Sequence, residues 1–366
     1  ATVPLYEREG ALAFELGGDG VQFDPGSAAL HLLDPATGVR RPPATADLVA
    51  LARLVDALPH YAAQSTAMTP GDVPESIADR WRLYVALRHG RKPVVTGTFR
   101  ADGFAPMRDL LRAARGGAAA LAARPLAIFD CCPSPPLAWS PLTCDALLAC
   151  AREGIPAELV SMPLAGAAAP VTLRESVVQH CAESLSGIVL HQLAGPGAPV
   201  IYGGAPAAFD MRHGTAPMGA IETMMIACAY AQVGRHLRLP VHGYLAVSDA
   251  RALDYQAGLE SGIGAVLGAL AGVHLISGPG MLDYLLTQSL EKILLDHEAC
   301  GMALRLVRGV ARFECDVAAL FGDLARLGEF LSHPHTRAHW REELGVASPL
   351  IDRNTWSDWE AAGKRT

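Results

Sequence analysis

The sequence predicts an α/β chain that folds as a (β/α)8 TIM barrel with a small N-terminal β element. Short apolar segments bounded by glycine or proline recur along the chain, and most of the intervals between them are roughly 30 to 43 residues, the size of one β/α unit. The segments between them have the 3.6-residue apolar period of helices. An open doubly wound sheet is the alternative, but no glycine-rich dinucleotide fingerprint follows any strand. The candidate strands are residues 60–68, 93–98, 125–130, 157–162, 199–204, 241–247 and 273–278.

Closure of the barrel requires an eighth strand after the seventh. Residues 282–307 and 315–327 read as helices, and "EFLSHPH" at 329–335 is the best candidate for the last strand. A helix is also expected from Thr172, where Glu175 completes a capping-box pattern. The side of this helix that should face the core is apolar and consists of Val178, Cys181, Ala182, Leu185 and Val189. In the helix at 220–237, the side expected to face the core consists of Ile221, Met225, Cys228 and Ala229.

The N-terminal part of the chain has the turn chemistry of β hairpins. One hairpin is expected around residues 17–20 and another around Asp34 and Pro35. We therefore predict three parts: N-terminal hairpins at 1–45 packed on the barrel, the barrel at 46–345, and a C-terminal tail at 346–366.

Composition excludes several classes of protein. The 366 residues are 51% hydrophobic and 18% charged, with a net charge of −7, which supports a large core and argues against disorder and against nucleic acid as a partner. No apolar run of about 18 residues predicts a membrane span, and no secretory signal is visible. The cysteines form no CxxC pair, so we expect reduced thiols in a cytoplasmic protein. They are residues 131, 132, 144, 150, 181, 228, 300 and 315.

In a barrel, functional residues lie in the loops that follow the carboxyl ends of the strands. Asp210 and Arg212 follow the fifth predicted strand. Arg212 is either a salt-bridged loop anchor or a ligand for a substrate carboxylate, which a guanidinium binds through two hydrogen bonds. Asp210 is a candidate catalytic residue that would orient Arg212 or meet a cation. Asp249, after the sixth strand, is the second candidate catalytic residue.

Aromatic side chains also gather near the predicted strand ends. Each one alone is explained by core packing, but together they can form a cage for a quaternary ammonium ion. These aromatic candidates for substrate binding are Phe129, Trp139, Tyr202, Phe209 and Tyr244, and Met162, Ser248 and Gln256 are expected beside them. Small residues from Ala165 to Ala169 would let a ligand or a macromolecule approach the backbone.

Histidines at 333, 335 and 339 have a spacing that can supply metal ligands. They serve equally as helix caps and surface groups, and no HExxH, GxSxG or Walker-type motif accompanies them. No metal site is therefore predicted, and a metal-dependent barrel lyase or hydrolase stays an alternative.

Several blocks of the sequence resemble the trimethylamine methyltransferase family. They are "MPLAGAAAPVTL", "AESLSGIVLHQLAGPGAPVIYGG", "FDMRHG", "SDARALDYQAGLE", "LAGVHLISGPGML" and "HPHT", which lie in the family's order from about residue 60 to 345. The resemblance implies a barrel that transfers a methyl group from a methylated amine to the cobalt of a separate corrinoid protein. Under it, no cofactor is bound tightly, because the partner supplies the corrinoid (cobalamin), and a homo-oligomer is expected.

The founding members of the family carry pyrrolysine, whereas every residue here is one of the ordinary twenty and the loop after the sixth strand reads "LAVSDAR". The resemblance thus points to the non-pyrrolysine branch and to a betaine-like quaternary amine, with Arg212 on its carboxylate. Family members are longer, so segments at one or both ends are expected to be missing. A sensor that binds quaternary amines without turnover is the alternative from another class.

Overall fold

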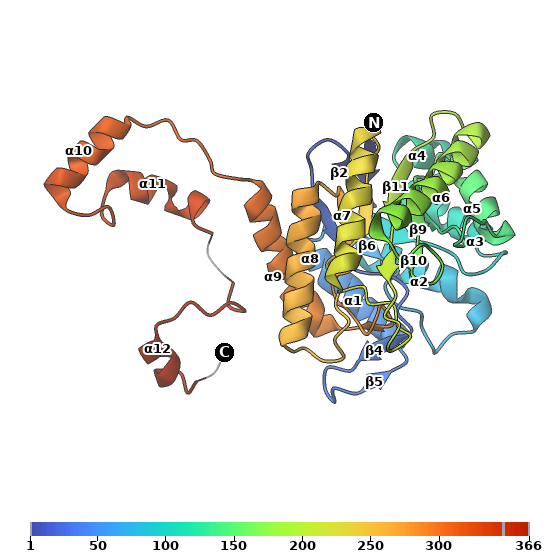
Figure 1. Cartoon of the computed structure of the whole chain (residues 1–366), viewed down its shortest axis with the longest axis horizontal. Helices are drawn as coiled ribbons and strands as arrows, with labels where there is room; N and C mark the ends of the chain where they lie inside the picture. The colour runs from blue at the N-terminus through green and yellow to red at the C-terminus, as the bar shows by residue number, and fades with distance from the viewer. Residues whose placement is uncertain (1, 346–347, 365–366) are drawn as a thin grey trace. The chain divides into compact units, whose positions relative to one another are not determined.

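Parallel strands dominate the computed structural model, which describes residues 2–345 and 348–364 (Figure 1). The larger sheet has the order β11-β9-β8-β7-β6, and every neighbouring pair in it is parallel. This order follows the chain, as expected for consecutive β/α units. The strands are β6 (Gln64–Ser65), β7 (Val94–Thr96), β8 (Ala127–Cys131), β9 (Ala157–Ser161) and β11 (Val200–Gly204).

A second parallel sheet continues the first on both sides. It has the order β13-β14-β3, with β13 at His242–Tyr244, β14 at Leu275–Ser277 and β3 at Gln22–Asp24. A parallel bridge between Tyr202 and Val241 links β11 to the start of β13. At the other side, the N–H of Ala62 donates to the carbonyl of Phe23 at 2.8 Å, so the chain leading into β6 lies beside β3.

The prediction of a last strand at 329–335 is wrong, because these residues are turns and the first residues of a helix. The strand beside β14 comes instead from the N-terminal part of the chain, since β3 pairs with β14 in parallel from Gln22 to Asp24. All seven other predicted strand segments overlap a strand of the parallel sheets, and six of them contain it entirely, since β8 extends one residue beyond 125–130.

The N-terminal hairpins are confirmed in part. β4 (His31–Leu33) and β5 (Arg40–Arg41) form the antiparallel pair predicted around Asp34. The first hairpin is wrong as placed: β2 (Leu12–Leu16) pairs with β1 (Val3–Tyr6), not with β3. Short strands follow later in the chain: β10 (Leu164–Ala165), β12 (Ala207–Ala208), β15 (Met281–Leu282) and β16 (Thr287–Gln288).

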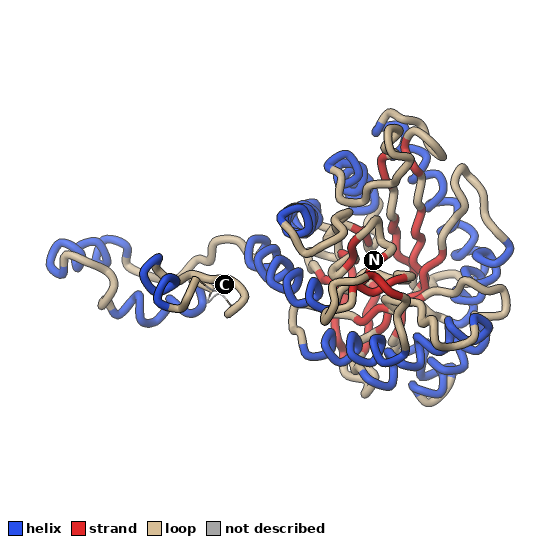
Figure 2. Tube along the Cα trace, turned by 90° about the horizontal axis from the view of Figure 1, so that it is seen from below, coloured by secondary structure: helices blue, strands red, loops and turns tan. Residues whose placement is uncertain are grey.

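Helices form a layer outside the strands, which lie at the centre of residues 1–301 in Figure 2. Helices α6, α7 and α8 pack side by side, each on the next (Figure 1). The helices are α1 (Thr45–Ala57), α2 (Glu75–His89), α3 (Phe104–Arg115), α4 (Ala118–Ala123), α5 (Pro141–Glu153), α6 (Leu173–Ala194), α7 (Ile221–His236), α8 (Tyr255–Ala271) and α9 (Leu290–Val307).

Helix α6 begins after Thr172 as predicted, but the predicted core-facing side is turned outward. Val178 and Val189 are 63% and 57% exposed, whereas His180 and Glu183 are buried. Both of these buried side chains have partners: Glu183 accepts from the Ser161 hydroxyl at 2.6 Å, and Nε2 of His180 lies 3.0 Å from the carbonyl oxygen of Gly203. Helix α7 behaves in the same way, with exposed Ile221 and Met225.

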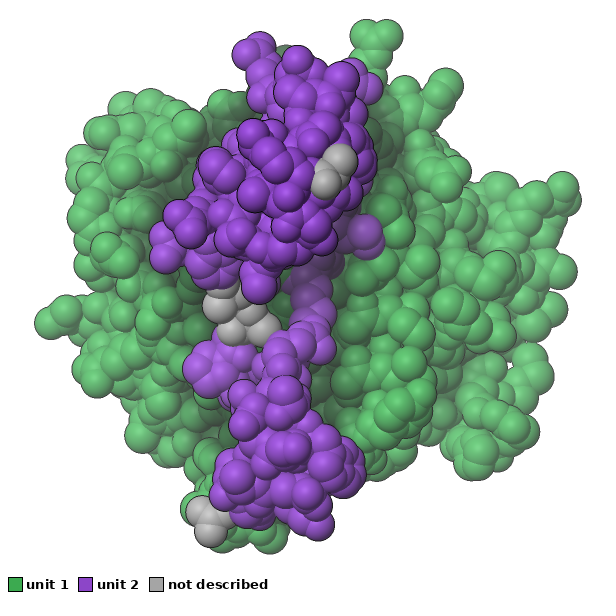
Figure 3. Space-filling view, turned by 90° about the vertical axis from the view of Figure 1, so that its left-hand side faces the viewer, with its two compact units in different colours: residues 1–301 green, residues 302–366 purple. Residues whose placement is uncertain are grey.

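The chain divides into two compact units, residues 1–301 and 302–366, coloured green and purple in Figure 3. This division differs from the predicted boundaries at 45/46 and 345/346. Residues 1–45 belong to the first unit because β3 is part of its parallel sheet. The second unit contains α10 (Val317–Leu327), α11 (Pro334–Glu343) and α12 (Trp356–Ala361). Among the described residues, none of the helices is long and apolar enough to cross a membrane.

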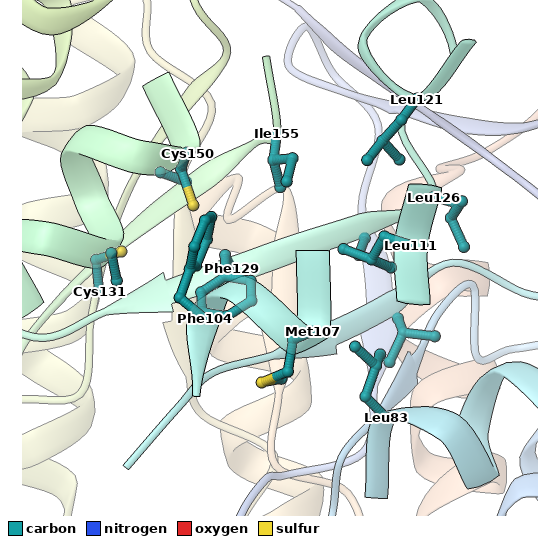
Figure 4. Close-up of a cluster of buried hydrophobic side chains, with 14 of the residues drawn as sticks. Leu83, Phe104, Met107, Leu111, Leu121, Leu126, Phe129, Cys131, Cys150 and Ile155 are labelled. Atoms are coloured by element: carbon teal, nitrogen blue, oxygen red, sulfur yellow. The ribbon is translucent and has the colours of Figure 1, made fainter. Parts of the chain in front are cut away.

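Part of the apolar core of the first unit lies between the strands and helices α2 to α5. Phe129 on β8 meets Phe104 on α3 edge to face, with ring centroids 5.0 Å apart. Met107 and Leu111 extend the contact along α3, and Cys131 and Cys150 lie at its edge (Figure 4). All eight cysteines are free thiols, in agreement with the prediction.

Candidate functional site

A cavity of about 190 Å³ lies where the carboxyl ends of the parallel strands converge. This size suits a small metabolite, since drug-sized ligands occupy about 300–1,000 Å³. The position is the one that parallel α/β folds use for their active sites. Most lining residues come from the ends of β3, β6, β7, β8, β9, β11 and β13 or the loops after them, while Arg82 comes from α2 and Leu285 from the loop between β15 and β16. The lining residues are Ser27, Ala28, Thr66, Arg82, Gly97, Thr98, Phe99, Asp130, Cys132, Val160, Met162, Ala205, Tyr244 and Leu285.

Arg82 supplies a fixed positive charge in the wall of the cavity. Its side chain is 2% exposed, and it donates to the carbonyls of Thr66 at 3.1 Å and Gly97 at 2.8 Å. Asp79, one turn earlier on α2, lies 3.4 Å from the guanidinium. The Nε of Arg82 is buried without a hydrogen-bond partner in the described part of the chain. Its guanidinium is therefore held rigidly, although its Nε–H has no acceptor among the described residues.

Asp130 supplies a carboxyl group to the same cavity. It follows Phe129 on β8, and strand alternation places Phe129 in the outer core and Asp130 toward the cavity. Its Oδ1 is buried and accepts no hydrogen bond from the described residues. The Tyr244 hydroxyl pairs with that of Ser27 at 2.8 Å, so its ring is fixed in the wall. Phe99 lies in the wall as well, with Arg82 4.8 Å from its ring centroid.

Further ionisable groups are buried among the same strands. Nδ1 of His242 lies 2.6 Å from Oε1 of Glu158, although the approach is out of line for a hydrogen bond. Nε2 of His242 pairs with the Ser277 hydroxyl at 2.9 Å, and that hydroxyl donates to Asp24 at 2.6 Å. Asp24, Glu158 and His242 are each 0% exposed. Polar contacts among these side chains thus link β3, β9, β13 and β14 in the interior.

Burial shifts the protonation of this interior strongly. It raises the pKa of Glu158 and of Asp24 well above their usual values, and for Asp24 the Ser277 hydrogen bond opposes the shift. It also raises the pKa of Asp130, and the Glu158 charge raises it further. Burial lowers the pKa of His242 to about 4. These groups therefore favour their neutral forms, because a charge away from water needs a partner.

A second, open groove of about 470 Å³ lies beside the loops that follow β9 and β11. Its lining includes the exposed side chain of Met211, together with Ala165 and Ala208. Ala165 and Ala208 are paired in the parallel ribbon of β10 and β12. Met162, three residues before Ala165, lines the cavity, so chain geometry limits the separation of these two residues to about 10 Å.

Comparison with known proteins assigns the chain to a protein family. The family model described as "Trimethylamine methyltransferase (MTTB)" matches residues 4–366. The chain belongs to the trimethylamine methyltransferase family. The trimethylamine methyltransferase MttB of Desulfitobacterium hafniense (strain DSM 10664 / DCB-2) is 32% identical over 366 residues, which are 100% of this chain and 73% of that protein. A glycine betaine methyltransferase of Desulfitobacterium hafniense (strain Y51) is 29% identical over 367 residues, covering 98% of this chain and 75% of that protein.

A solved structure shares the fold of this family member. The hydroxylamine complex of MtmB superimposes with a TM-score of 0.54 at 14% identity, over 81% of this chain and 63% of that one. The chain spans about half the length of the Methanosarcina trimethylamine methyltransferases that it matches.

The structure brings two of the predicted substrate-binding residues into the cavity of this family member. They are Tyr244 and Met162. Phe209, Asp210 and Arg212 line the open groove instead. There Asp210 holds Arg212, and their hydrogen bonds lower the pKa of the carboxyl far below its usual value.

Other predicted residues lie outside both hollows. Phe129 packs in the outer core, and Trp139 packs beside it while its indole N–H donates to Ser186 at 3.0 Å. Tyr202 is buried, and its hydroxyl donates to the Cys181 thiol at 3.0 Å. In each case strand alternation or loop packing directs the ring toward a helix.

The residues predicted after the sixth strand hold the local backbone. Asp249 accepts from the N–H groups of Met218 and Gly219, both at 2.9 Å, and burial raises its pKa to about 6. The Ser248 hydroxyl donates to Glu260 at 2.6 Å, and Gln256 donates to the same carboxylate at 2.9 Å. These contacts place all three in the scaffold beneath the loops.

Sequence reasoning missed Arg82 because it lies inside a helix, where arginine is most often a surface residue. It also missed Glu158 and His242, single polar residues within apolar strands. That combination is itself a usable signal, since a charged residue inside a buried strand needs a reason. Among the described residues, no group of three or more His, Cys, Asp or Glu is arranged to hold a metal ion. His333 caps α11 by accepting from the N–H of His335 at 3.1 Å.

Proposed function

We propose that this chain removes a methyl group from a quaternary, betaine-like amine and delivers it to the cobalt of a corrinoid protein. The observation that carries the proposal is the small cavity with Arg82 and Asp130 in one wall. A betaine carries a carboxylate and a fixed cationic nitrogen, so it needs one partner of each sign. The glycine betaine methyltransferase relative supports this choice of substrate class.

The fold proposed for this activity is a complete (β/α)8 barrel. The five-stranded and three-stranded parallel sheets supply its strands, the Tyr202–Val241 bridge joins them on one side, and the Ala62–Phe23 hydrogen bond lies at the other. In this arrangement β3 is the first strand of the barrel rather than part of a separate hairpin. The cavity then occupies its carboxyl-terminal mouth.

Arg82 orients the substrate in the proposed mechanism. Its hydrogen bonds to Thr66 and Gly97 fix the guanidinium in the cavity wall, where a substrate carboxylate would pair with its positive charge through a hydrogen bond. A charge-assisted hydrogen bond of this kind is short and directional. Asp130 and the Tyr244 ring face the cationic nitrogen, where a carboxylate and an aromatic quadrupole both stabilise positive charge. The S-methyl of Met162 and the Phe99 ring limit the access of water.

The methyl acceptor would reach the substrate from the open groove. When bound, a reduced corrinoid supplies a cobalt nucleophile that attacks the methyl carbon in line. The residues fit such a group, because Ala165 and Ala208, the members of the β10–β12 ribbon that line the groove, carry only small side chains. The protein's contribution is positioning and electrostatics, since the C–N bond breaks with its electron pair on nitrogen and a tertiary amine leaves.

The test is a methyl-transfer assay with the purified chain, a reduced corrinoid protein and a panel of amines. Glycine betaine should yield dimethylglycine and change the visible spectrum of the corrinoid. An Asp130→Asn variant should lose this activity, whereas the exposed α5 variant Asp145→Asn should keep it. If the chain binds betaine but transfers no methyl group to any competent corrinoid protein, it is instead a sensor of quaternary amines.

A further inference from the structure

More acids than bases lie around the cavity and the interior beneath it. Asp24, Asp130 and Glu158 project from β3, β8 and β9, and Asp79 from α2 accompanies Arg82. The bases facing them are Arg82 and His242, while Tyr244 and Cys132 are neutral wall residues whose pKa values burial raises well above normal. Arg82 is already matched by Asp79. The three carboxyls of Asp24, Asp130 and Glu158 therefore share, at most, one titratable base.

The contacts between these groups require protons. At 2.6 Å, two lone pairs would repel, so a proton belongs to either Glu158 or His242. Asp24 has one oxygen bonded to Ser277 and the other, Oδ2, buried without a partner in the described residues. Oδ1 of Asp130 is likewise unpartnered at the cavity. Since His242 can neutralise only one of the three buried carboxyls, at least one of the others favours its protonated form while the cavity is empty.

We propose that a cationic substrate enters this cavity in exchange for a proton, which is expelled from the carboxyl cluster of Asp24, Asp130 and Glu158. The inference rests on the proposed function for the choice of a quaternary ammonium as the cation. A trimethylammonium group brings a permanent positive charge but no proton, so it favours the ionised carboxylate beside it. After methyl transfer the tertiary nitrogen is neutral and no longer offsets the carboxylate charge, so once the amine has left, the cluster takes one proton back from water.

Calorimetry with glycine betaine tests the exchange directly. Betaine has no group that titrates near neutral pH, so any proton released comes from the protein. The buffer takes up any released proton, so the measured binding enthalpy includes the ionisation enthalpy of the buffer. Between phosphate and Tris it should therefore differ by the difference of their ionisation enthalpies, multiplied by about one proton. The affinity should rise by up to tenfold per pH unit between pH 6 and 8, as linkage requires for one proton.

Isosteric variants locate the proton. Asp130→Asn, Glu158→Gln and Asp24→Asn are measured beside Asp145→Asn, whose exposed carboxyl on α5 does not line the cavity. Loss of the buffer dependence in at least one cluster variant, with Asp145→Asn unchanged, supports the proposal. Far-ultraviolet circular dichroism confirms that each variant is folded.

Two outcomes would overturn the exchange. Wild-type binding with the same enthalpy in both buffers means that no proton moves, whatever the methyl-transfer assay shows. Retention of the full buffer dependence in all three folded cluster variants puts the proton elsewhere. If glycine betaine and tetramethylammonium both fail to bind, the proposed function fails together with the exchange.

Discussion

Arg212 is bound to Asp210, its neighbour two residues earlier in the chain. The guanidinium Nη2 lies 2.8 Å from Oδ2 of Asp210, and the backbone N–H of Arg212 donates to Oδ1 at 2.8 Å. The Arg212 side chain is 82% exposed. A guanidinium committed to a neighbour and surrounded by water has little to offer a buried substrate, so the proposed function assigns the carboxylate of a betaine to Arg82 instead.

The first prediction concerns Arg212→Ala. An exposed ion pair contributes about 0–1 kcal/mol, so the free energy of unfolding should change by less than about 1 kcal/mol. Affinities for glycine betaine and tetramethylammonium should change by the same factor. Arg174→Ala is the matched control, because Arg174 is 87% exposed and pairs with the adjacent Glu175. If Arg212→Ala weakens the binding of carboxylated amines alone, Arg212 and not Arg82 binds the substrate carboxylate.

Arg82→Lys should separate the two kinds of ligand. Lysine keeps the charge but lacks the planar fork, so it cannot satisfy Thr66, Gly97 and a carboxylate together. We expect glycine betaine to bind about 2 kcal/mol more weakly, and tetramethylammonium to lose much less. Calorimetry on both ligands measures the difference. Equal losses for the two would mean that Arg82 only braces the loops after β6 and β7.

Two buried histidines on α6 should make stability sensitive to acid. Burial lowers the pKa of His180 to about 3 and of His191 to about 4, against about 6.5 in an unfolded chain. A depressed folded-state pKa contributes stability above pH 6.5 that is lost as the pH falls. At pH 5 each should cost about 2 kcal/mol relative to pH 8.

Urea unfolding at pH 5, 6 and 8 measures this effect. His180→Gln should take up one proton fewer on unfolding below pH 6.5, so the slope of its stability against pH should be shallower. His213→Gln, at a side chain that is 69% exposed, should leave the slope unchanged. An unaltered slope in folded His180→Gln would contradict the assignment.

Two glycines on α8 should respond in opposite ways to alanine. A Cβ at Gly264 would overlap the backbone carbonyl of Leu245, whereas nothing lies within 4 Å of one at Gly262. Gly262→Ala should stabilise by up to about 1 kcal/mol through helix propensity. Gly264→Ala should destabilise by about 2–3 kcal/mol, because α8 has to move away from the end of β13. Thermal unfolding of the pair measures both changes. Similar melting temperatures would show that α8 shifts at little cost.

The apolar strands were predictable because a parallel strand is buried on both faces, so its sequence is a short run of consecutive apolar residues. The place of β3 in the parallel sheet was not predictable, since Gln22 and Asp24 flank its one large apolar residue, Phe23. The same limitation reversed α6: its pattern directs Val178 inward, whereas the fold buries His180 on the carbonyl of Gly203. Local hydrophobicity cannot reveal a buried polar partner that lies far along the chain.

The candidate site followed the same rule. The loops at the strand ends were predicted correctly as the region of the cavity, since the chirality of β/α units places all of them at one end. Which side chains enter the cavity depends on the register of each strand. Phe129 and Asp130 are adjacent, and one residue of register decides which of them lines the cavity.

The open groove provides the last prediction, which separates partner docking from substrate binding. Met211 is 65% exposed in the groove, and Met225 is 53% exposed on the outer side of α7. A charge at the centre of a docked interface typically costs more than 1 kcal/mol. Met211→Glu should therefore slow methyl transfer to the corrinoid protein about tenfold or more while glycine betaine binds with unchanged affinity. Met225→Glu, with the same change in charge, should transfer at the wild-type rate. Equal rates for the two variants would move the docking surface away from the groove, and a loss of betaine affinity in Met211→Glu would make the groove part of the substrate site.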